Sequence, residues 1–390
     1  MRIRIIIKGR SWLFQLANSL NKSNNLEKLV TTYPKFFTKN FHIPNNKVNS
    51  VIFLFGIEKF LSKFINPLLK KLKIKFDPMV FIDWLSDLIF SLFYVKNADY
   101  LLVGFGASTC KIIKKAKKKG IKTIYFLNSS SSGYQINVKN EYDRLGLSNK
   151  YYKEPKVLTD RIEKSIKTAD YIGALSTSQK QTYIDDGLLK NKKIFLNLMG
   201  VDTSIFYPTN KKKEKFIIIT VGNNFVRKGL KYLLESFNDL NLSNSELWIV
   251  GDTDINIVNQ LVKVEKNNIF KGIVNEFNLP NLYNQSSVFC LPSFEEGLPI
   301  VIPQAMACGL PVISSHFASD IVKNGEEGFI LNAGDKIELS KKIKYFYDNP
   351  EKIIEMGTKA RKTSENLLSY DNLAERILNF CKNEDNPNKI

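Results

Sequence analysis

Short hydrophobic runs alternate with longer amphipathic stretches in the first half of the chain. Runs rich in Ile, Val and Leu, which are typical of strands, occupy residues 2–7, 29–33, 98–105, 122–127, 170–175 and 193–197. Stretches with helical spacing of apolar residues lie at 11–22, 108–119, 159–169 and 177–187;. Ser108 is expected to cap the third of these helical stretches, and Gly120 to end it. This order predicts a parallel sheet with right-handed crossovers.

The same alternation starts again after a polar, lysine-rich interval at residues 208–215, which we interpret as a linker;. Beyond it, strands are predicted at 216–221, 246–251, 269–272, 287–291, 311–314 and 328–331. Helices are predicted at 229–238, 297–309, 336–349 and 351–367. A chain of 390 residues suits two domains;. We therefore predict an α/β protein with two Rossmann-like, doubly wound domains whose ligands sit in the cleft between them.

The longest apolar stretch of the chain runs from Met79 to Val95 and contains two carboxylates, Asp83 and Asp87. Two acids in such a segment argue against a membrane span. We expect a mostly buried helix in which both acids share one face. Near the N-terminus, the apolar run is only Ile5 to Ile7, which is too short for the core of a secretory signal;.

The chain is strongly basic, with 57 Lys and Arg against 38 Asp and Glu and a net charge of +19. This balance favours anionic partners such as phosphates, nucleic acid or an acidic membrane, although solvated lysines in a lysine-rich composition give the same number. The four cysteines lack metal-binding spacing, and the chain has only two histidines, so a His-rich metal site is nearly excluded;. Cysteines scattered among apolar residues are typical of the reduced core of a cytoplasmic protein.

The first segment with candidate chemistry is residues 221–229, VGNNFVRKG. A predicted strand ends here, a turn with Gly222 follows, and Arg227 and Lys228 precede a predicted helix. Backbone N–H groups at the start of that helix and the two cations would all face an anion. An ordinary turn with two exposed cations is the alternative interpretation.

A second and more informative segment spans residues 292–313, PSFEEGLPIVIPQAMACGLPVI. A strand leads into an acidic turn, and a helix is expected to open between Gly297 and Ile300 and to close at Gly309. Gly297 would let a ligand approach the backbone closely, and the first amides of the helix would point at a diphosphate. Gln304 lies eight residues beyond Glu296 and would sit about two turns into the helix;. Pro303 is expected in or near the first turn.

This second segment resembles the signature of family 4 (group 1) glycosyltransferases, which have the GT-B fold. The usual signature is E-x7-E, with an apolar run and A-M-A-x-G-x-P-V after the second acid. Here Glu296 and the run from Ala305 to Val312 match, but the second acid is Gln304, which makes the motif E-x7-Q. In the family, the first acid contacts the donor sugar and the second binds ribose hydroxyls. A glutamine can still exchange hydrogen bonds with a ribose diol.

Further segments match the family pattern in the expected order. Lys228 corresponds to the lysine that binds the donor diphosphate, whereas the separate arginine of the family is replaced by Asn223, so Arg227 would have to supply that charge. Gly9 lies in the first strand–helix loop, where the family places a glycine near the donor phosphate. The segment Gly200-Val201-Asp202 resembles the end of the first domain, and residues 369–381 resemble a terminal helix that crosses back to it.

The resemblance implies an organisation and a site. Residues 1–205 would form the acceptor-binding domain, residues 206–368 the nucleotide-sugar-binding domain, and residues 369–390 the helix that returns to the first domain. The catalytic residues would be Glu296 and Lys228. The donor would be bound by Gly9, Gly222, Asn223, Arg227, Lys228, Glu296, Gly297, Leu298 and Gln304.

The activity that the resemblance implies is transfer, with retention of configuration, of a hexose-type sugar from a UDP- or GDP-linked donor to a glycan or lipid-linked acceptor. The leaving diphosphate would be stabilised by cations and backbone amides, so neither a metal nor another cofactor is expected. Many relatives have a histidine in the first domain that contacts the sugar. The corresponding loop here, residues 128–135, contains serines instead, which would either bind a sugar or form a polar surface loop.

Two alternatives to an enzyme remain open at this point. The changes at Gln304 and Asn223 would also suit an inactive, sugar-binding or scaffold relative. A nucleic-acid-binding protein is the less favoured alternative, because no helix-turn-helix, RNP or zinc pattern accompanies the positive charge, and we expect no nucleic-acid partner.

Two lysine-rich stretches suggest a further partner. Six lysines and no acid lie between Lys59 and Lys75, and seven lysines and no acid lie between Lys111 and Lys122. As amphipathic basic stretches they could bind the anionic inner face of the membrane and bring the chain to a lipid-linked acceptor. Solvated helix faces that cover the core are the simpler interpretation.

Overall fold

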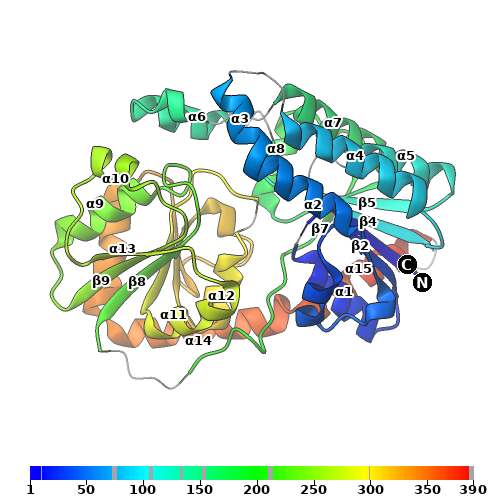
Figure 1. Ribbon diagram of the computed structural model, residues 1–390. Helices are drawn as coiled ribbons and strands as arrows, with labels where there is room; N and C mark the ends of the chain where they lie inside the picture. Colours follow the sequence, from blue (N-terminus) through cyan, green and yellow to red (C-terminus); the bar gives the residue numbers. More distant parts are fainter. Residues whose placement is uncertain are drawn as a thin grey trace.

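The computed structural model describes residues 1–9, 11–72, 77–104, 109–131, 135–151, 155–209, 214–297 and 299–385. The chain forms two parallel sheets side by side, each with helices on both faces (Figure 1). This is the pair of Rossmann-like domains that the alternation of strand and helix predicts, and the fold class is confirmed.

The first sheet has the order β3-β2-β1-β4-β5-β6-β7, and all of its strands are parallel. Its strands are β1 (Ile3–Ile7), β2 (Leu26–Thr31), β3 (Val48–Ser50), β4 (Tyr100–Gly104), β5 (Lys122–Phe126), β6 (Tyr171–Ala174) and β7 (Lys193–Leu196). Strand β1 is buried along its whole length, as expected for a central strand covered on both faces;.

The second sheet has the order β10-β9-β8-β11-β12-β13, again all parallel. Its strands are β8 (Phe216–Val221), β9 (Ser245–Val250), β10 (Asn268–Gly272), β11 (Val288–Leu291), β12 (Val312–Ser315) and β13 (Gly328–Leu331). In both sheets the order reverses at the first strand, and ligands of such sheets bind at the carboxyl ends of the strands on either side of that reversal. Here these ends belong to β8 and β11 in the second sheet.

The first half of the chain contains the helices α1 (Leu13–Lys22), α2 (Ile52–Phe60), α3 (Asn66–Lys71), α4 (Pro78–Phe93), α5 (Cys110–Lys118), α6 (Ile136–Arg144), α7 (Lys156–Thr168) and α8 (Thr177–Asp185). A π-helical turn, η3 (Leu61–Ile65), joins α2 to α3. The second half of the chain contains α9 (Leu230–Leu240), α10 (Ile255–Leu261), α11 (Leu279–Gln285), α12 (Val301–Ala307), α13 (Lys336–Asp348), α14 (Pro350–Leu367) and α15 (Tyr370–Asp385).

The side-chain alternation along β1 divides the first domain into two cores. Ile3, Ile5 and Ile7 pack with apolar residues of α1 and α15, whereas Ile6 packs with residues of α2, α4, α5 and α7. The first of these clusters continues through Val201, in the segment between β7 and β8, into the second domain. One hydrophobic cluster therefore extends through both domains.

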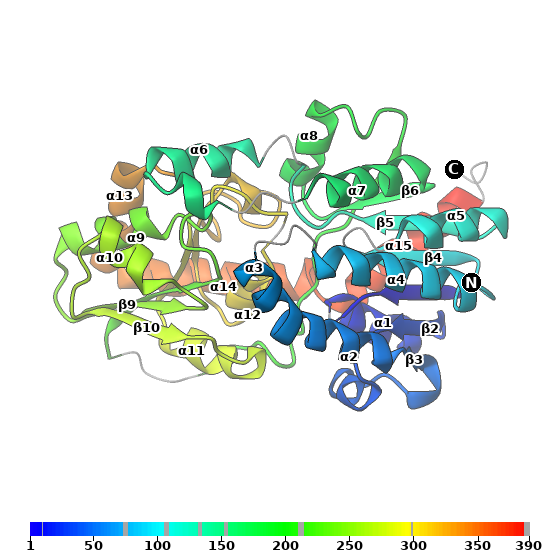
Figure 2. The same ribbon diagram turned by 45° about the horizontal axis from the view of Figure 1, so that its top comes forward.

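Two helices cross between the domains. Helix α15 returns to the first domain, where it packs beside α1 and the hydroxyl of Tyr100 donates to the carbonyl of Cys381 at 3.0 Å (Figure 1). Helix α6, by contrast, comes from the first half of the sequence but lies against the second domain (Figure 2). Its Tyr142 is buried in the core of that domain, and the Tyr142 hydroxyl donates to the side chain of Asn224 at 2.9 Å.

Several local expectations differ from the structure. Helix α4 forms where the long apolar stretch predicts it, but it is not mostly buried, because Phe81, Trp84, Leu92 and Phe93 are exposed. The short strand β3 and the helices α2 and α3 carry no clear periodic signal and were not expected. The proposed capping residue Ser108 lies outside the described residues, and α5 has Thr109 at its N-cap position.

The two acids of α4 have separate partners. Asp83 pairs with Lys8 in the first strand–helix loop. The buried carboxylate of Asp87 accepts from the backbone amides of Lys111 and Ile112 at 2.9–3.0 Å and pairs with Arg161 at 2.9 Å. Asp87 therefore satisfies free amides at the start of α5, a capping role provided by a residue more than twenty positions away.

All four cysteines are buried, and none forms a disulfide. Cys110 and Cys381 belong to the first domain, and Cys290 and Cys308 to the second. Burial raises the pKa of Cys381 to about 12 and raises that of Cys290 as well. Among the described helices, none combines the length and the apolar character that crossing a membrane requires.

Candidate functional site

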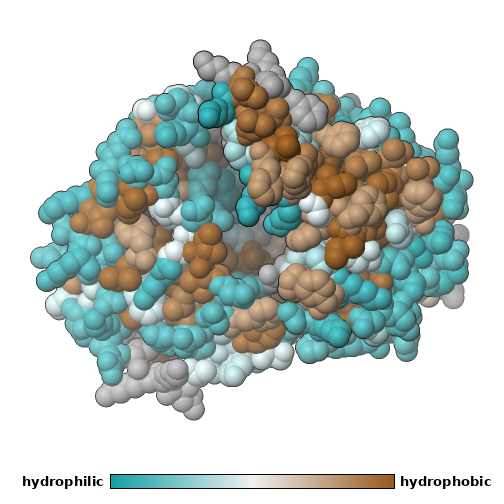
Figure 3. Space-filling model, in the orientation of Figure 1, coloured by the Kyte–Doolittle hydropathy of each residue, from teal (hydrophilic) through white to brown (hydrophobic). Residues whose placement is uncertain are grey.

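A cavity of about 670 Å³ lies between the two domains. The first half of the chain contributes Ser11, Trp12, Asn128, Ser129, Leu175 and Met199. The second domain contributes residues from the turns after β8 and β11 and from the start of α12. Both halves of the protein are therefore needed to form this site, and the hollow is visible between the domains in Figure 3.

The turn after β8 is arranged around a buried lysine. A Cβ atom added at Gly222 would lie 2.6 Å from Cε of Lys228, so glycine leaves the room that the lysine side chain occupies. Asn223 lines the cavity, and its side-chain oxygen accepts from the backbone amide of Asp252 at 2.8 Å. Asn224 adopts a left-handed conformation with φ of 71°, at the start of the turn that carries Lys228 and precedes α9;.

The turn after β11 brings two acids to the same place. The Glu296 carboxylate accepts from Lys228 at 2.5 Å and from the hydroxyl of Ser293 at 3.0 Å, and Nη1 of Arg227 lies 3.0 Å from it. Arg227 also donates to the backbone carbonyl of Glu295 at 2.9 Å. Two cations and two acids thus form one compact cluster on the second-domain wall of the cavity.

This cluster is largely withdrawn from solvent. Lys228 is 6% exposed and Glu296 is 7% exposed. Burial alone would raise the pKa of Glu296, but the charges of Lys228 and Arg227 hold it below its ordinary value. Burial lowers the pKa of Lys228, and its ion pair with Glu296 opposes that effect. Glu296 is therefore ionised at neutral pH and acts only as a hydrogen-bond acceptor.

The first domain holds the acidic turn from the opposite side. The amide of Ser130 donates to the Glu295 carboxylate at 2.9 Å, and its hydroxyl donates to the carbonyl of Glu296 at 3.1 Å. The hydroxyl of Ser176 donates to the carbonyl of Gly297 at 2.7 Å. A Cβ atom at Gly297 would lie 2.5 Å from the carbonyl oxygen of Asn128, so only glycine allows this approach of the domains.

These contacts show what sequence reasoning missed. In the serine-rich loop after β5, Asn128 and Ser129 line the cavity, whereas Ser130 and Ser131 are buried. Residues 132–134 of that loop lie outside the described residues. Ser176 and Gln179 both support the glycine turn, but the sequence does not single out either residue. Ser176 donates to a backbone carbonyl 121 positions away, and Gln179 donates to the backbone carbonyl of Ser129, 50 positions away.

Most of the expected donor-binding residues meet in the cleft cavity: Gly222, Asn223, Arg227, Lys228, Glu296 and Gly297 all line it. Gly9 is not among the residues that line the cavity; it has φ of 73°, and its amide donates to the hydroxyl of Thr32 at 2.9 Å. Ser11 and Trp12 of the same loop line the cavity instead. Leu298 lies outside the described residues. Gln304 lines two adjoining cavities towards the linker.

Helix α12 begins later than the sequence pattern suggests. Its first residue is Val301, so Gly297 lies in the loop before it, and Gln304 is the fourth helical residue, one turn in and not two. Pro303 is the third residue of the helix, where a missing N–H costs no intrahelical hydrogen bond;. The amide of Gly297 therefore belongs to the loop and not to the helix end.

The chemistry of this cavity follows from its groups. Two cations and a flexible glycine turn can bind a phosphorylated ligand, and an ionised carboxylate can accept hydrogen bonds from hydroxyl groups beside it. Among the described residues, no group of three or more His, Cys, Asp or Glu side chains is placed to hold a metal ion.

Residues 202–363 match the model of the glycosyl transferases group 1 family. A glycosyltransferase of Haemophilus influenzae is 29% identical over 227 residues, which cover 56% of this chain and 62% of that protein. A probable sucrose-phosphate synthase of Thermosipho melanesiensis is 25% identical, with 95% of this chain and 89% of that protein aligned. The chain is a glycosyltransferase.

A third relative and two solved structures are also similar to this chain. An α-1,4-N-acetylgalactosaminyltransferase of Campylobacter jejuni that acts on an undecaprenol-diphosphate-linked glycan is 28% identical, over 50% of this chain and 55% of that protein. Sucrose-phosphate synthase of Thermosynechococcus elongatus superimposes with a TM-score of 0.71 at 16% identity, covering 99% of both chains. HepE of Anabaena, solved with UDP, gives a TM-score of 0.69 at 15% identity, covering 98% of this chain and 100% of HepE. These structures identify the fold as GT-B.

Proposed function

We propose that this glycosyltransferase moves a hexose-type sugar, with retention of configuration, from a UDP- or GDP-linked donor to a glycan or lipid-linked acceptor, as a member of family 4. The observation that carries the proposal is the meeting of Arg227, Lys228 and Glu296 in one cavity lined by both domains. Neighbouring structures with bound UDP and UDP-glucose support a nucleotide-sugar donor.

Arg227 and Lys228 serve the leaving group. The bond between the anomeric carbon and the diphosphate breaks during transfer, and negative charge develops on the diphosphate oxygen. Cations already fixed in a site that excludes water stabilise such charge without reorganising during the reaction. Lys228 is fixed by its burial and by Glu296, and Arg227 is fixed by the carbonyl of Glu295.

Glu296 orients the sugar. Since its carboxylate is ionised and already accepts from Ser293 and Lys228, it has no proton to give, and we assign it no role as a general acid. It accepts hydrogen bonds from hydroxyl groups of the donor sugar instead. The pairing with Lys228 ties the position of the sugar to that of the diphosphate.

The transfer step needs no nucleophile from the protein. The acceptor hydroxyl attacks the anomeric carbon from the side on which the diphosphate leaves, and its proton passes to the departing phosphate oxygen. One carbon–oxygen bond forms, one breaks, and the configuration is retained. We propose that this step proceeds without a metal, because Arg227 and Lys228 provide the positive charge that a metal would supply elsewhere.

The first experiment is a thermal-shift screen of the full chain against UDP, GDP and ADP sugars, since a ligand that binds the folded state raises the melting temperature. The donor that shifts it is then tested for turnover in the presence and absence of EDTA, and the anomer of the product is assigned by NMR. We expect turnover in both conditions, an α product from an α donor, and loss of turnover in Glu296→Ala. Binding without any turnover would favour the inactive, sugar-binding alternative.

We further propose that this enzyme works at the inner face of a membrane. An apolar ridge, defined here as the exposed side chains of the α2–α3 segment and α4, covers one side of the first domain (Figure 3). Its members are Ile52, Phe53, Phe60, Phe64, Leu68, Leu72, Phe81, Trp84, Leu92 and Phe93. Such a contiguous apolar surface on one domain marks an interaction site.

The charges around the apolar ridge favour an anionic bilayer as its partner. Between Pro34 and Phe76 the sequence has nine lysines and a single acid, Glu58. Lys63 lies 5.4 Å from the ring centre of Phe64, and Lys111 of α5 lies 4.5 Å from that of Trp84, so both lysine-rich stretches border the ridge. Lysines at the edge of an inserted apolar surface each contribute about 1 kcal/mol of attraction to anionic lipid.

The ridge also lies where a lipid-linked acceptor would need it. Helices α2 and α3 run along the first domain towards the second (Figures 1 and 2), and the hollow between the domains opens beside them (Figure 3). A bilayer in contact with the ridge would hold the polar head of an acceptor near the cleft. The Campylobacter relative that acts on an undecaprenol-linked glycan supports such an acceptor.

Sedimentation with vesicles of phosphatidylcholine alone or mixed with phosphatidylglycerol tests this proposal. We expect binding only to the anionic vesicles, weaker binding at high salt, and a loss of about tenfold in Phe60→Ser/Phe64→Ser. The control is Ile354→Ser, which removes an even more exposed apolar side chain from α14 of the other domain. Equal sedimentation with neutral and anionic vesicles, or a stable dimer that the double variant abolishes, would overturn the membrane assignment.

A further inference from the structure

Gln304 occupies an unusual position beside the donor cavity. It is 3% exposed and sits on the first turn of α12, facing the cleft. Among the hydrogen bonds of the described residues, its side-chain amide donates one, whereas its carbonyl oxygen Oε1 is buried without any partner. A buried acceptor without a partner costs free energy, which a ligand hydroxyl at this point would recover.

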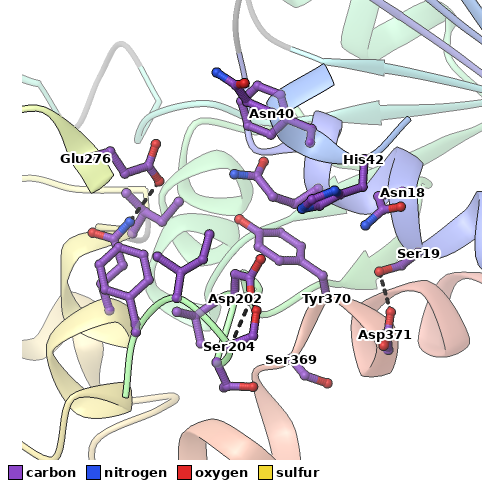
Figure 4. A pocket seen from close by; sticks show the side chains of 18 of the residues that line it. Asn18, Ser19, Asn40, His42, Asp202, Ser204, Glu276, Ser369, Tyr370 and Asp371 are labelled. Atoms are coloured by element: carbon purple, nitrogen blue, oxygen red, sulfur yellow. Dashed lines mark hydrogen bonds between the residues drawn. The ribbon is translucent and has the colours of Figure 1, made fainter. Parts of the chain in front are cut away.

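The group that holds Gln304 is an acid from a different part of the domain. Nε2 of Gln304 donates to Oε1 of Glu276 at 3.1 Å. Glu276 stands at the start of the short turn between β10 and α11, and its side chain points towards the cavity next to the linker (Figure 4). The two side chains line the same two cavities. Together they present one amide oxygen and one carboxylate on the same wall.

The position of Gln304 and Glu276 relative to Lys228 indicates which part of a bound nucleotide they would contact. The cavity that contains Glu276 and Gln304 shares Ser11, Trp12, Ile300 and Val301 with the cleft cavity that contains Lys228. In a nucleoside diphosphate, the ribose follows directly after the phosphates. A ligand with its diphosphate at Lys228 and its nucleoside along this wall therefore brings its ribose diol to Gln304 and Glu276.

Resting on the proposed use of a nucleotide-sugar, we propose that Glu276 is the residue that supplies the carboxylate for the ribose diol of the donor. Gln304 accepts from one hydroxyl through Oε1 and holds Glu276 in place through Nε2. A carboxylate has room for several hydrogen bonds, so Glu276 accepts from the ribose while it keeps Gln304. Glu276, from a neighbouring loop, thus supplies the carboxylate that the family signature has at position 304.

Simple electrostatics explains why the pair contains only one acid. A glutamate at 304 would place a second carboxylate about 3 Å from that of Glu276, and two carboxylates at that distance cannot both ionise without a large penalty. A glutamine at 304 removes this repulsion and adds a donor that fixes the remaining acid. The glutamine and the acid therefore form one unit, and changing both together should preserve its chemistry.

Calorimetric titration of the full chain with UDP and 2′-deoxy-UDP, and in parallel with GDP and 2′-deoxy-GDP, tests the inference. The parent should bind the ribonucleotide about tenfold more tightly than its 2′-deoxy form, because a hydrogen bond to a charged acceptor is lost. Glu276→Gln should weaken ribonucleotide binding about tenfold and lose this preference. Glu276→Gln/Gln304→Glu, which exchanges the two side chains, should restore it.

The control is Glu265→Gln, which removes an acid of the same domain that pairs with Lys263 and does not line the cavity. It should leave both affinities and their ratio unchanged. If Glu276→Gln keeps the parent's preference for the ribonucleotide, the inference is overturned while the proposed function stands. If the parent binds neither UDP nor GDP, the proposed function fails and this inference fails with it.

Discussion

At the scale of single residues, the centre of the site is a buried cluster with a net charge of zero. Two cations, Arg227 and Lys228, face two acids, Glu295 and Glu296, and Lys228 has Glu296 as its ionic partner within 4 Å among the described residues. Removing one partner from a buried ion pair is more costly than never having formed the pair, because a desolvated charge is left behind. The cluster should therefore contribute to stability as well as to donor binding.

Glu296→Gln should lower the free energy of unfolding by about 3–5 kcal/mol at neutral pH, because Lys228 then remains buried without its anionic partner. The pKa of Glu296 is lower in the folded state than in the unfolded state. Its contribution is therefore complete above the ordinary pKa of about 4.3 and is lost as the pH falls through the folded value. Urea unfolding between neutral and acidic pH should show the gap between parent and variant narrowing.

The matched change at the surface is Glu355→Gln on α14, which removes an exposed acid with two lysine partners, Lys352 and Lys359. Exposed pairs contribute little to stability, so this variant should unfold at the same urea concentration as the parent. If the difference in free energy of unfolding between the parent and Glu296→Gln stays constant as the pH falls, the carboxylate charge of Glu296 is not what stabilises the cluster.

At the scale of elements, the start of the lysine-rich helix α5 depends on an acid that belongs to α4. Asp87 accepts from two α5 amides and pairs with Arg161 of α7, so one carboxylate joins three helices. Burial raises the pKa of Asp87, and its hydrogen bonds and Arg161 act against that effect. The contacts of Asp87 thus offset the cost of burying its charge.

Asp87→Asn should destabilise the protein by about 2–3 kcal/mol, because an NH2 donor replaces the carboxylate oxygen that accepts from Lys111 and Arg161, and Arg161 loses its counterion;. The free energy of unfolding in urea and the hydrogen exchange of the first α5 amides are the measurements. Asp143→Asn, which removes an exposed acid paired with Lys139 on α6, is the control and should be neutral. Unchanged exchange at Lys111 and Ile112 in Asp87→Asn would contradict the capping role.

The elements differ in how well their sequences predict them. Strands such as β8 and β9 are continuous apolar runs between polar turns, so their positions follow from periodicity alone;. Strand β3 has only three residues and one buried side chain, which leaves no period to detect. The segment of α2, η3 and α3 is apolar on most sides, and its pattern does not show which side faces the protein.

At the scale of the whole molecule, the two domains are joined where two chain crossings lie side by side. Val201, between β7 and β8, forms a parallel bridge with Ser369, and its amide donates to the carbonyl of Leu368 at 2.5 Å. Arg376 of α15 donates to the carbonyls of both Leu198 and Leu367. Any change in the angle between the domains must therefore move the backbone at both crossings.

Gly200→Ala tests how closely these crossings are packed. The added Cβ would lie 2.6 Å from the ring of Tyr370, so the variant should lose about 1–3 kcal/mol of stability through overpacking;. Gly56→Ala on α2 is the matched control, because its Cβ would meet no atom within 4 Å. That substitution should add about 0.5–1 kcal/mol by favouring the helix. A Gly200→Ala protein as stable as the parent would show that the side chains at the crossings can move to accommodate the added Cβ without loss of stability.

The sequence predicts the site only as far as its motifs are local. Arg227, Lys228, Glu296 and Gly297 lie in two short segments, and the parallel order of β8 and β11 is enough to bring those segments together;. The contact of Gln304 with Glu276 depends instead on how a loop packs on a helix 28 positions away. The same holds for Ser130 and Ser176, whose importance appears only when the domains meet.

The rates at which the four buried thiols react with an alkylating reagent can report how fast each domain opens locally. Alkylating reagents react with an exposed thiolate, so a buried cysteine stays unmodified while its surroundings remain closed. Cys110 and Cys381 report on the first domain, and Cys290 and Cys308 on the second. Mass spectrometry of a labelling time course would thus resolve two opening rates in one sample, and a bound nucleotide should slow labelling first at Cys290 and Cys308.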